Sequence, residues 1–525
     1  MVEIIHAMPL YLMRFRRLVI PLIVAFTGAC VLIIEVLAVR ILSPYFGNTI
    51  YTFSSVLTVV LAALSVGYYC GGRLIDRSPT LRVFFGAILF AGIGVLVLHA
   101  LVTILLPFVG FRLSPISGPL VLSTLFFGAP CIFLGLLSPM AVRLQKDINV
   151  REGIGGTAGD IFCFSTIGSI AGSLLAGFVL IPAFGITAIL IAIGIALMAL
   201  GFLGLSLSRK TVSVPLFLGS VLLLVIVVSG ERFARIPGKG VLLLNEGLYE
   251  QIAVVDGDWK GRPARFLRQD SNLSSAVFLD SPIADLVFDY TKYFAVHKIL
   301  KPNIHRALFL GAGAYTLPRL LLQELPTSEV HVTEIEPTLP TIAHAYFDLP
   351  SDSPIQTHTA DARRFLYDSE TPYDLIYGDA YASGFIVPPH LLTEEFFRLV
   401  RSKLSADGIF IGNFFGNLTD TAPSFVMSAM RTFRSVFQSS TFFAVTDRDS
   451  LEPQHIAFVG QNGTMNTDFC SVKLRSSSDR LLSSLCEKII DVSPKILAAF
   501  PLLTDDYAPA EYLTGLTLKK MMRGI

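Results

Sequence analysis

Long apolar runs in the first 230 residues constrain the fold of this chain more than any other feature. Seven of them are long enough to cross a bilayer as helices. They cover residues 18–39, 50–70, 83–107, 119–140, 160–182, 186–206 and 212–229. Only 15% of all residues are charged and the mean hydropathy is +0.64, which is too apolar for an ordinary soluble protein. The first half therefore predicts a multi-span helical membrane bundle.

Basic residues at the ends of these segments predict their orientation. Arg14, Arg16 and Arg17 precede the first segment, and Arg143 and Lys146 follow the fourth. Further basic residues lie between the second and third segments and after the sixth, namely Arg73, Arg77, Arg82, Arg209 and Lys210. Because lysine and arginine accumulate in cytoplasmic loops, we expect a cytoplasmic amino terminus.

This pattern leaves open which side of the membrane carries the carboxyl-terminal half. Seven crossings from a cytoplasmic start would place it outside, whereas the nucleoside chemistry inferred below needs a cytoplasmic cofactor pool. The fifth segment begins at the glycine-rich residues 153–159 and is the least secure span, so we favour a cytoplasmic domain. Cys470 and Cys486 would then be free thiols, whereas a disulfide between them would place the domain outside.

Small residues recur along one face of the fifth segment. They are Gly168, Ser169, Gly172, Ser173 and Gly177. Such a face allows close approach of two helices, either within the bundle or between the chains of a homo-oligomer.

A glycine turn organises the carboxyl-terminal half. The apolar run 307–310 predicts a buried strand, Gly311 and Gly313 interrupt it, and a helical pattern follows from about residue 315 to 325. A second strand, 330–333, ends at Glu334. This is the skeleton of a nucleoside-binding doubly wound sheet, in which glycines admit a ligand to the backbone and the acid binds ribose hydroxyls.

The remaining elements extend this α/β pattern. Alternating residues 249–255 and 264–268 predict a hairpin in a small β lobe. Later strands are expected at 357–361, 373–378, 409–415, 441–445 and 456–460, the last two as an end hairpin. We divide the chain into a bundle (1–230), a linker with the β lobe (231–300) and a Rossmann-like domain (301–525). The strand ends would bring Gly311, Gly313, Glu334, Asp361 and Asp379 to one crevice.

Two other classes of function receive no support from the composition. The net charge is +1 and no basic patch with interleaved aromatic residues occurs, so nucleic-acid binding is not expected. Six cysteines are present, but no Cys-x-x-Cys or His/Cys cluster has zinc spacing, so a metal site is not expected either.

Several short motifs carry a resemblance to a known family. They lie at residues 310–315, 332–337, 360–362, 373–379, 388–396 and 503–509. In this order they resemble the class I methyltransferase fold, specifically its spermidine-synthase-like branch. Residues 34–40 and 46–48 in the apolar half are similar to bacterial fusions of a membrane bundle to such a domain. The resemblance implies an integral protein of a bacterial inner membrane.

The resemblance also implies roles for the strand-end residues. Gly311 and Gly313 would lie beside the methionine-derived part of the cofactor, which is S-adenosylmethionine or its decarboxylated form. Glu334 would hold the ribose hydroxyls and Asp361 would face the adenine amino group. Asp379 would lie at the mouth of the transfer site as the catalytic residue.

Aromatic residues flank the same expected pocket. Tyr315 and Tyr381 would stack on the cofactor or shape the acceptor site, and Tyr290 would contact the acceptor. His390 is more consistent with packing or capping than with a base. Asp505 and Asp506 would either close over the pocket, or cap a helix or tie down a loop.

This chain departs from true aminopropyltransferases at three positions. The aspartate of the glycine loop is Ala314, the aspartate three residues after the strand-end acid is Ala382, and the glutamate of a Tyr-x-Glu motif is Lys292. These changes remove counter-charges and a general base, so we do not expect ordinary spermidine synthesis.

Two hypotheses follow. The first is a membrane-integrated transferase that uses either sulfonium donor to alkylate an amine or polyamine acceptor. The second is a transporter or sensor whose carboxyl-terminal domain binds a nucleoside or polyamine without turnover.

Overall fold

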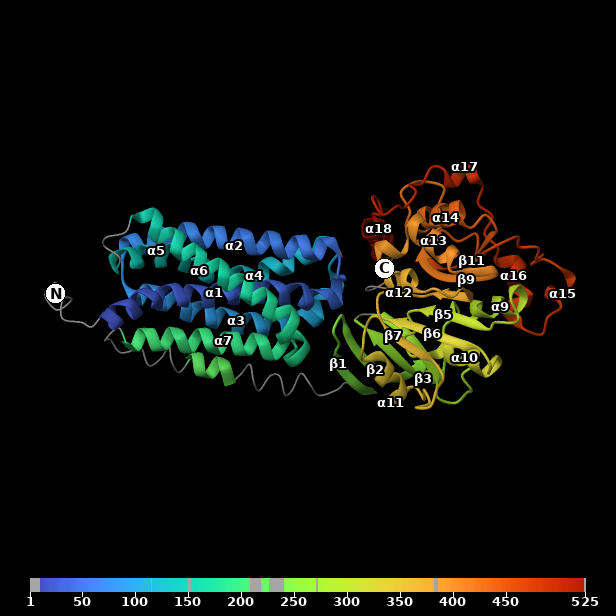
Figure 1. The fold of residues 1–525 in the computed structure, drawn as a ribbon, viewed down its shortest axis with the longest axis horizontal. Coiled ribbons are helices and arrows are strands. Elements are labelled where there is room, and N and C mark those ends of the chain that lie inside the picture. The colour runs from blue at the N-terminus through green and yellow to red at the C-terminus, as the bar shows by residue number, and fades with distance from the viewer. Residues whose placement is uncertain are drawn as a thin grey trace. The chain divides into compact units, whose positions relative to one another are not determined.

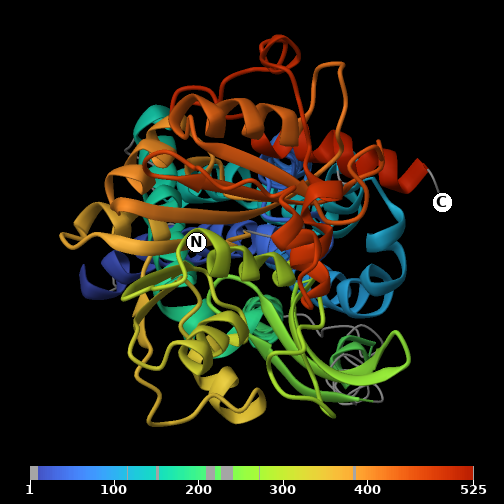
Figure 2. The ribbon, with the colours of Figure 1, turned by 90° about the vertical axis from the view of Figure 1, so that its right-hand side faces the viewer.

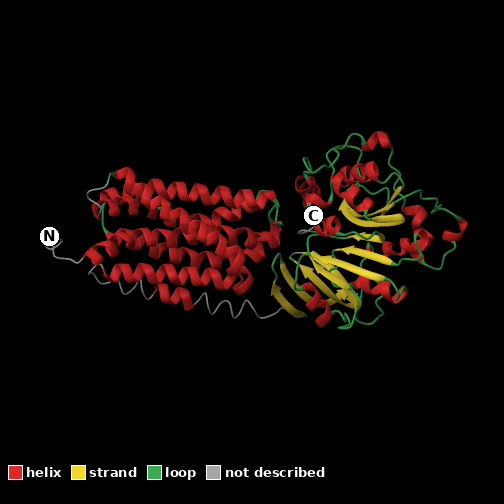
Figure 3. Cartoon of the chain, in the orientation of Figure 1, coloured by secondary structure: helices red, strands yellow, loops and turns green. Residues whose placement is uncertain are grey.

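A computed structural model describes residues 10–114, 116–148, 153–207, 219–225, 240–270, 272–381 and 386–523. The chain divides into two compact units, Met1–Ile236 and Pro237–Ile525. In the first unit the described elements are helices, and all described strands belong to the second (Figures 1 and 3). This division agrees with the expected change from an apolar bundle to an α/β domain.

The first unit is a bundle of long apolar helices. They are α1 (Leu10–Phe46), α2 (Ile50–Arg77), α3 (Leu81–Val109), α4 (Gly118–Gly135), α5 (Leu137–Ile148), α6 (Ile154–Leu175) and α7 (Ile181–Leu207). The Thr49 hydroxyl caps the start of α2 by accepting a hydrogen bond from the Thr52 amide. Most buried side chains of these helices form one apolar core that includes Ile34, Val60 and Phe127, and a smaller cluster lies between α3 and α7.

Within the described residues, five helical stretches are long and apolar enough to cross a membrane. The fifth, Ile154–Leu207, has 54 residues. At about 1.5 Å per residue it would extend on the order of 80 Å, far beyond the ~30 Å of a bilayer core. It is interrupted at Gly185, whose φ of 70° and ψ of 165° are not helical. Since α6 packs along α1 and α7 along α3, the stretch consists of two arms, close to the expected segments 160–182 and 186–206.

The total number of crossings stays a prediction. Of the expected seventh segment, 212–229, only residues 219–225 are among those described, and they are helical. The fourth expected segment, 119–140, corresponds to α4 continued by α5.

The small-residue face of α6 is used within the chain. A Cβ atom on Gly168 or Gly172 would collide with the carbonyl oxygens of Ala25 and Ala29 in α1. The Ser169 hydroxyl donates to the Gly28 carbonyl oxygen at 3.2 Å. These glycines therefore allow α6 to pack on α1, and a homo-oligomer formed through this helix stays a prediction.

The second unit begins with the expected β lobe. Four strands form an antiparallel sheet in chain order, namely β1 (Val241–Glu246), β2 (Gln251–Trp259), β3 (Arg262–Gln269) and β4 (Asn272–Phe278). The turn between β2 and β3 places Lys260 and Gly261 at φ of 53° and 84°, a left-handed conformation that glycine adopts readily. The predicted hairpin at 249–255 and 264–268 matches β2 and β3.

A seven-stranded sheet follows, in the order β10-β11-β9-β8-β5-β6-β7. Its strands are β5 (Arg306–Leu310), β6 (Glu329–Glu334), β7 (Gln356–Thr359), β8 (Tyr373–Gly378), β9 (Leu404–Gly416), β10 (Ser440–Ala444) and β11 (Gln454–Gln461). Strands β5 to β9 are parallel, and β11 pairs antiparallel with β9 and β10. The chain runs outward from β5 to β7 and then returns to β8, so the strand order reverses between β5 and β8. Ligands of open α/β sheets bind at such a point.

Helices cover both faces of this sheet (Figure 2). They include η4 (Thr291–Val296), α9 (His297–Leu300), α10 (Thr316–Glu324), α11 (Leu339–Tyr346), α12 (Ala362–Asp368), η5 (Pro389–Leu391), α13 (Glu394–Ser402), α14 (Phe425–Val436), α15 (Val472–Arg475), α16 (Arg480–Lys488), α17 (Pro494–Leu497) and α18 (Ala510–Arg523). Leu308 and Leu310 of β5 pack into the core shared with α12, α13 and α14. Ala307 and Phe309 point to the opposite core, shared with η4 and α10. This alternation confirms the doubly wound, Rossmann-like domain with a terminal hairpin.

Cys470 and Cys486 form a disulfide that joins the residues before α15 to α16. The expectation that these two cysteines are free thiols is therefore wrong. Neither sequence position nor spacing indicated the bond, because it depends on how α15 and α16 fold against each other.

Candidate functional site

The loop between β5 and α10 brings the backbone close to two neighbouring elements. Gly311 and Gly313 have φ of 78° and 51°. A Cβ on Gly311 would lie 2.8 Å from the Asp379 carbonyl oxygen after β8, and one on Gly313 would lie 3.1 Å from Ser275 Cβ in β4. Both positions therefore need glycine, for backbone conformation and for space.

Glu334, at the end of β6, lies against this loop. Its carboxylate accepts hydrogen bonds from the backbone amides of Ala312, at 3.3 Å, and Glu336, at 3.2 Å. Burial raises the pKa of Glu334, although these backbone donors oppose the shift. The expected ribose acid thus lies directly beside the expected glycine turn.

Other acids gather around Glu334 from the β lobe and β6. Glu250 has its pKa raised to about 8, first by burial and further by the negative charges of Asp270, Glu334 and Glu336. The Gln269 amide donates to Glu250, and Glu336 accepts from the Tyr249 amide at 2.9 Å. Glu250 was missed in the sequence, where it stands in an ordinary strand-edge position. It becomes notable only when the lobe folds over β6.

Asp361 caps α12 and binds a histidine. Its carboxylate accepts from the Arg364 amide at 2.9 Å and from His390 Nε2 at 2.8 Å. The hydrogen bond from His390 is the main reason that the pKa of Asp361 is lowered. His390 is therefore a direct partner of the expected adenine-binding acid, and it lies within the short helix η5.

An ion pair holds the carboxyl-terminal segment close to Asp361 and His390. Arg363 makes a bidentate ion pair with Asp505, both N–O distances being 2.6 Å, and also donates to the His390 carbonyl oxygen at 3.1 Å. Thr393 donates to Asp505 at 2.7 Å. Asp505 thus ties down a loop, which was one of the two roles considered for it.

Asp379 follows β8 at the point where the strand order reverses. Its carboxylate accepts a hydrogen bond from Asn413 Nδ2 at 3.0 Å, and burial raises its pKa to about 7. The phenol groups of Tyr290, Tyr377 and Tyr381 surround it, and its charge contributes to raising the pKa of each. Asp379, Tyr290 and Tyr381 are each partly buried. The structure therefore brings together three residues that were predicted separately.

Two neighbours of Asp379 were not predicted. Asn413 lies near the end of β9, and its Oδ1 atom is 2.9 Å from Nδ1 of His455 at the start of β11. The His455 ring stacks on Tyr290, with centroids 4.5 Å apart and planes 19° from parallel. A polar residue inside the apolar run 409–415 was an available signal for Asn413. For His455 no local signal existed, because the antiparallel pairing of β11 with β9 places it there.

Tyr315 does not line the crevice. Its side chain is fully buried, and its hydroxyl lies 3.0 Å from Thr357 Oγ1. The residue itself adopts a left-handed φ of 61° just before α10. Tyr315 therefore supports the glycine loop from within the core.

The structure also locates the departures from the family pattern. Ala314 is 1% exposed and belongs to an apolar cluster with Val254 and Leu267 of the β lobe. Lys292 forms a surface ion pair with Asp289 at 2.7 Å, so its charge is partly compensated there. Ala382 lies outside the described residues.

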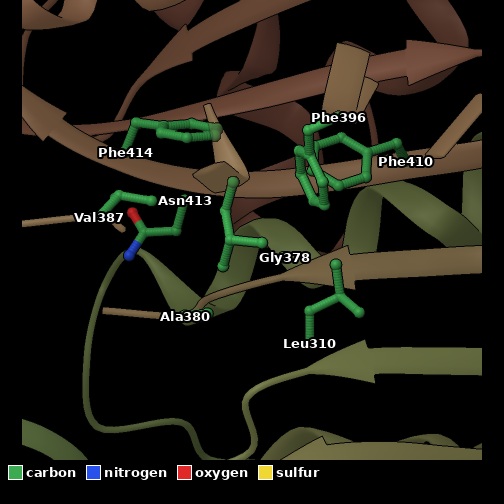
Figure 4. Close-up of a pocket in the computed structure, with 9 residues that line it drawn as sticks. Leu310, Gly378, Ala380, Val387, Phe396, Phe410, Asn413 and Phe414 are labelled. Atoms are coloured by element: carbon green, nitrogen blue, oxygen red, sulfur yellow. The ribbon is translucent and has the colours of Figure 1, made fainter. Parts of the chain in front are cut away.

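A small apolar pocket adjoins Asp379. It lies between the ends of β5, β8 and β9 and the segment leading to α13, and its lining residues are drawn in Figure 4. They are Leu310, Gly378, Ala380, Val387, Leu391, Phe396, Phe410, Asn413 and Phe414. The pocket measures ≈ 20 Å³, about the space of one water molecule, so it does not accommodate a nucleoside. Among the described residues, no group of three or more His, Cys, Asp or Glu side chains is arranged to hold a metal ion.

Several known proteins are similar to this chain in sequence. No family model matches the chain. Polyamine aminopropyltransferase 2 of Streptomyces coelicolor is 26% identical over 415 residues, which cover 73% of this chain and 71% of that protein. The polyamine aminopropyltransferase of Vibrio vulnificus is 26% identical over 195 residues, which cover 37% of this chain and 63% of that protein. This second match thus spans less than two thirds of its relative.

Solved structures are also similar to this chain. The probable spermidine synthase of Corynebacterium glutamicum is 21% identical, with a TM-score of 0.42, over 50% of this chain and 96% of that protein.

The strand order and register define a Rossmann-like domain. The sequence comparisons show which known proteins resemble the chain. The chain is similar in sequence to polyamine aminopropyltransferases, and among the described residues apolar helices long enough to span a membrane precede the Rossmann-like domain. This confirms the predicted resemblance and supports an enzyme of the spermidine-synthase type.

Proposed function

We propose that this chain is a membrane-integrated transferase that alkylates an amine with S-adenosylmethionine or its decarboxylated form. The observation that carries the proposal is the position of Asp379. Its carboxylate is partly buried among tyrosines, has a pKa of about 7, and lies beside the glycine turn that touches Glu334. A general base is most effective when its pKa is near the working pH.

The donor side of the site is formed by Gly311, Gly313, Glu334 and Asp361. Glu334 would accept hydrogen bonds from the ribose hydroxyls, and Asp361 would exchange His390 for the adenine amino group. The methionine-derived part would lie along the glycine turn, next to Asp379. The names of the relatives support a donor of this class, and either the intact or the decarboxylated molecule would fit these roles.

The reaction needs little from the protein beyond positioning and a base. The amine nitrogen attacks a carbon bonded to the sulfonium sulfur. The new C–N bond forms while that C–S bond breaks, so the sulfur leaves as a neutral thioether. The proton that the nitrogen gives up passes to Asp379, and Tyr290 and Tyr381 would form the walls that orient the amine.

We also propose that the transferase domain lies outside the cytoplasm, contrary to the side favoured from chemistry alone. The Cys470–Cys486 disulfide supports this location, because such bonds persist in oxidising compartments and are rare in the cytosol. The arginine pattern supports a cytoplasmic amino terminus. An odd number of membrane crossings would then place the transferase domain on the opposite side of the membrane. The apolar helices would anchor the domain in the lipid bilayer of an inner membrane.

A second candidate function is binding without turnover, as a sensor or as part of a transporter. The burial of Ala314 among apolar side chains favours it, because a carboxylate expected in an aminopropyltransferase is absent there.

One experiment separates the two candidate functions, transfer and binding without turnover. The purified full-length protein is incubated with each sulfonium donor and a panel of amines, and methylthioadenosine and S-adenosylhomocysteine are measured. If one of these two products is released only when an amine is present, the result supports the transferase. Donor binding without product supports the sensor.

A further inference from the structure

We infer that Asn413 and His455 are positioning residues that hold the Asp379 carboxylate as the proton acceptor for the attacking amine. The inference rests on the proposed transfer reaction and adds two residues that act through Asp379. The first observation behind it is a continuous chain of side chains across three strands. His455 in β11 contacts Asn413 in β9, and Asn413 contacts Asp379 after β8.

The hydrogen bonds in this chain have a defined direction. The Asn413 amide nitrogen donates to Asp379 Oδ1 at 3.0 Å, which leaves the amide oxygen as an acceptor. His455 Nδ1 lies 2.9 Å from that oxygen. Burial lowers the pKa of His455 to about 4, so at neutral pH the ring is uncharged and must carry its proton on Nδ1 to donate. The histidine thereby prevents the amide from rotating its oxygen towards the carboxylate.

The surroundings keep both positioning residues in place. Tyr290 stacks on the His455 ring, and Phe415 meets the same ring edge-on with centroids 5.1 Å apart. His455 is also paired in register with Phe415 across the antiparallel β9–β11 ladder. On the other side, the Tyr381 hydroxyl donates to the Asn413 carbonyl oxygen at 3.0 Å. Two tyrosines that would form the acceptor walls are thus built into the same network.

The charge balance around Asp379 gives this hydrogen bond its effect. The titratable groups that the described structure places against the carboxylate are Tyr290, Tyr377 and Tyr381, and all three have pKa values raised well above 10, so they stay neutral. Asn413 favours the charged form of Asp379, whereas burial opposes it. Without the amide donor the carboxylate would hold its proton to a higher pH and would be a poorer acceptor near neutrality.

The test uses two substitutions at the same position. His455→Phe keeps a ring that can stack between Tyr290 and Phe415 but removes the donor. His455→Asn removes the ring but offers an amide hydrogen near the position of Nδ1. His305→Phe, at an exposed position in the same domain, is the matched control.

The first readout is the pH dependence of kcat/KM for the best amine acceptor. We expect the acid limb of the His455→Phe profile to move up by about one to two pH units, the scale of one lost charge-assisted hydrogen bond. His455→Asn should return it towards the wild-type position, and His305→Phe should leave it unchanged. An unshifted limb in His455→Phe, or a reduced rate at all pH values with an unchanged profile, would overturn the inference.

The second readout does not require turnover. Binding of n-butylammonium to the full-length protein, in the presence of methylthioadenosine, is followed by calorimetry from pH 5 to 9. Binding should strengthen as Asp379 ionises, with a midpoint that shifts upward in His455→Phe. A shifted midpoint without any product in activity assays would retain the positioning role and reject the transferase. No ammonium binding to the wild type at any pH, or a midpoint that is the same in both proteins, would reject the positioning role itself.

Discussion

Gly311 and Asp379 approach each other so closely that a Cβ atom on the glycine would lie 2.8 Å from the aspartate carbonyl oxygen. The glycine turn that would receive the donor and the strand end that carries the base are therefore in direct backbone contact. Any substitution that separates them would affect donor binding and transfer together.

Gly311→Ala should destabilise the protein and weaken donor binding. The alanine would have to adopt φ of 78° and would press against the Asp379 backbone. We expect a loss of about 1–3 kcal/mol in the free energy of unfolding. Gly261→Ala is the control, because Gly261 has a similar φ of 84° but open space around it. Denaturation in detergent and calorimetry with methylthioadenosine measure the two effects. Equal losses in both variants would show that the close approach to Asp379 is unimportant.

Glu334→Ala should weaken the binding of an adenosyl nucleoside by roughly 1.5–3 kcal/mol, the range for a hydrogen bond to a charged group. Glu329→Gln serves as the control, because Glu329 begins the same strand but lies at its opposite end. Calorimetry with methylthioadenosine should show the loss only in the first variant. Unchanged affinity in Glu334→Ala would remove Glu334 from the donor site.

Asp379→Asn should abolish transfer while leaving donor binding intact. In the wild type, transfer should increase as pH rises through about 7, where Asp379 ionises. The effect on stability has the opposite sign. The folded pKa is above the usual 3.8, so the unfolded chain releases this proton first, and wild-type stability falls between about pH 4 and 7. Asp379→Asn should lose less stability than the wild type between pH 5 and 8. Retained transfer in this variant would show that another group accepts the proton.

Labelling of Cys470 and Cys486 tests the side of the membrane. The four other cysteines, Cys30, Cys70, Cys131 and Cys163, are replaced by serine. In intact spheroplasts we expect no reaction with an impermeant thiol reagent until an impermeant reductant has opened the disulfide. Labelling that appears only after lysis would place the domain in the cytoplasm.

Putrescine should be a poor acceptor with the decarboxylated donor. Both molecules are dications near neutral pH, and like charges in a pocket of low dielectric repel by several kcal/mol unless carboxylates lie between them. Ala314 and Ala382 occupy two positions where the family has such acids. Butylamine has the same carbon chain with one charge and should react faster than putrescine. Efficient formation of spermidine would mean that other acids have replaced the missing ones.

The parts of the site that follow local patterns could be predicted from the sequence. Gly311 and Glu334 are separated by one strand–helix–strand unit, so their meeting at a sheet edge is a property of that unit. Asn413 and His455 were missed because their contact depends on the antiparallel pairing of β11 with β9. Tyr315 was assigned to the pocket because a tyrosine next to a glycine turn has the same sequence signature in the core as at the surface.

The ion pair between Arg363 and Asp505 has a practical consequence for anyone who shortens or extends this protein. Arg363 binds both Asp505 and the carbonyl oxygen of His390, and His390 in turn binds Asp361. Asp505 is thus connected through Arg363 and His390 to the residue assigned to adenine. Removing the segment from Asp505 onward would remove the carboxylate that holds Arg363 against His390, so we expect a truncated form to show an altered donor affinity.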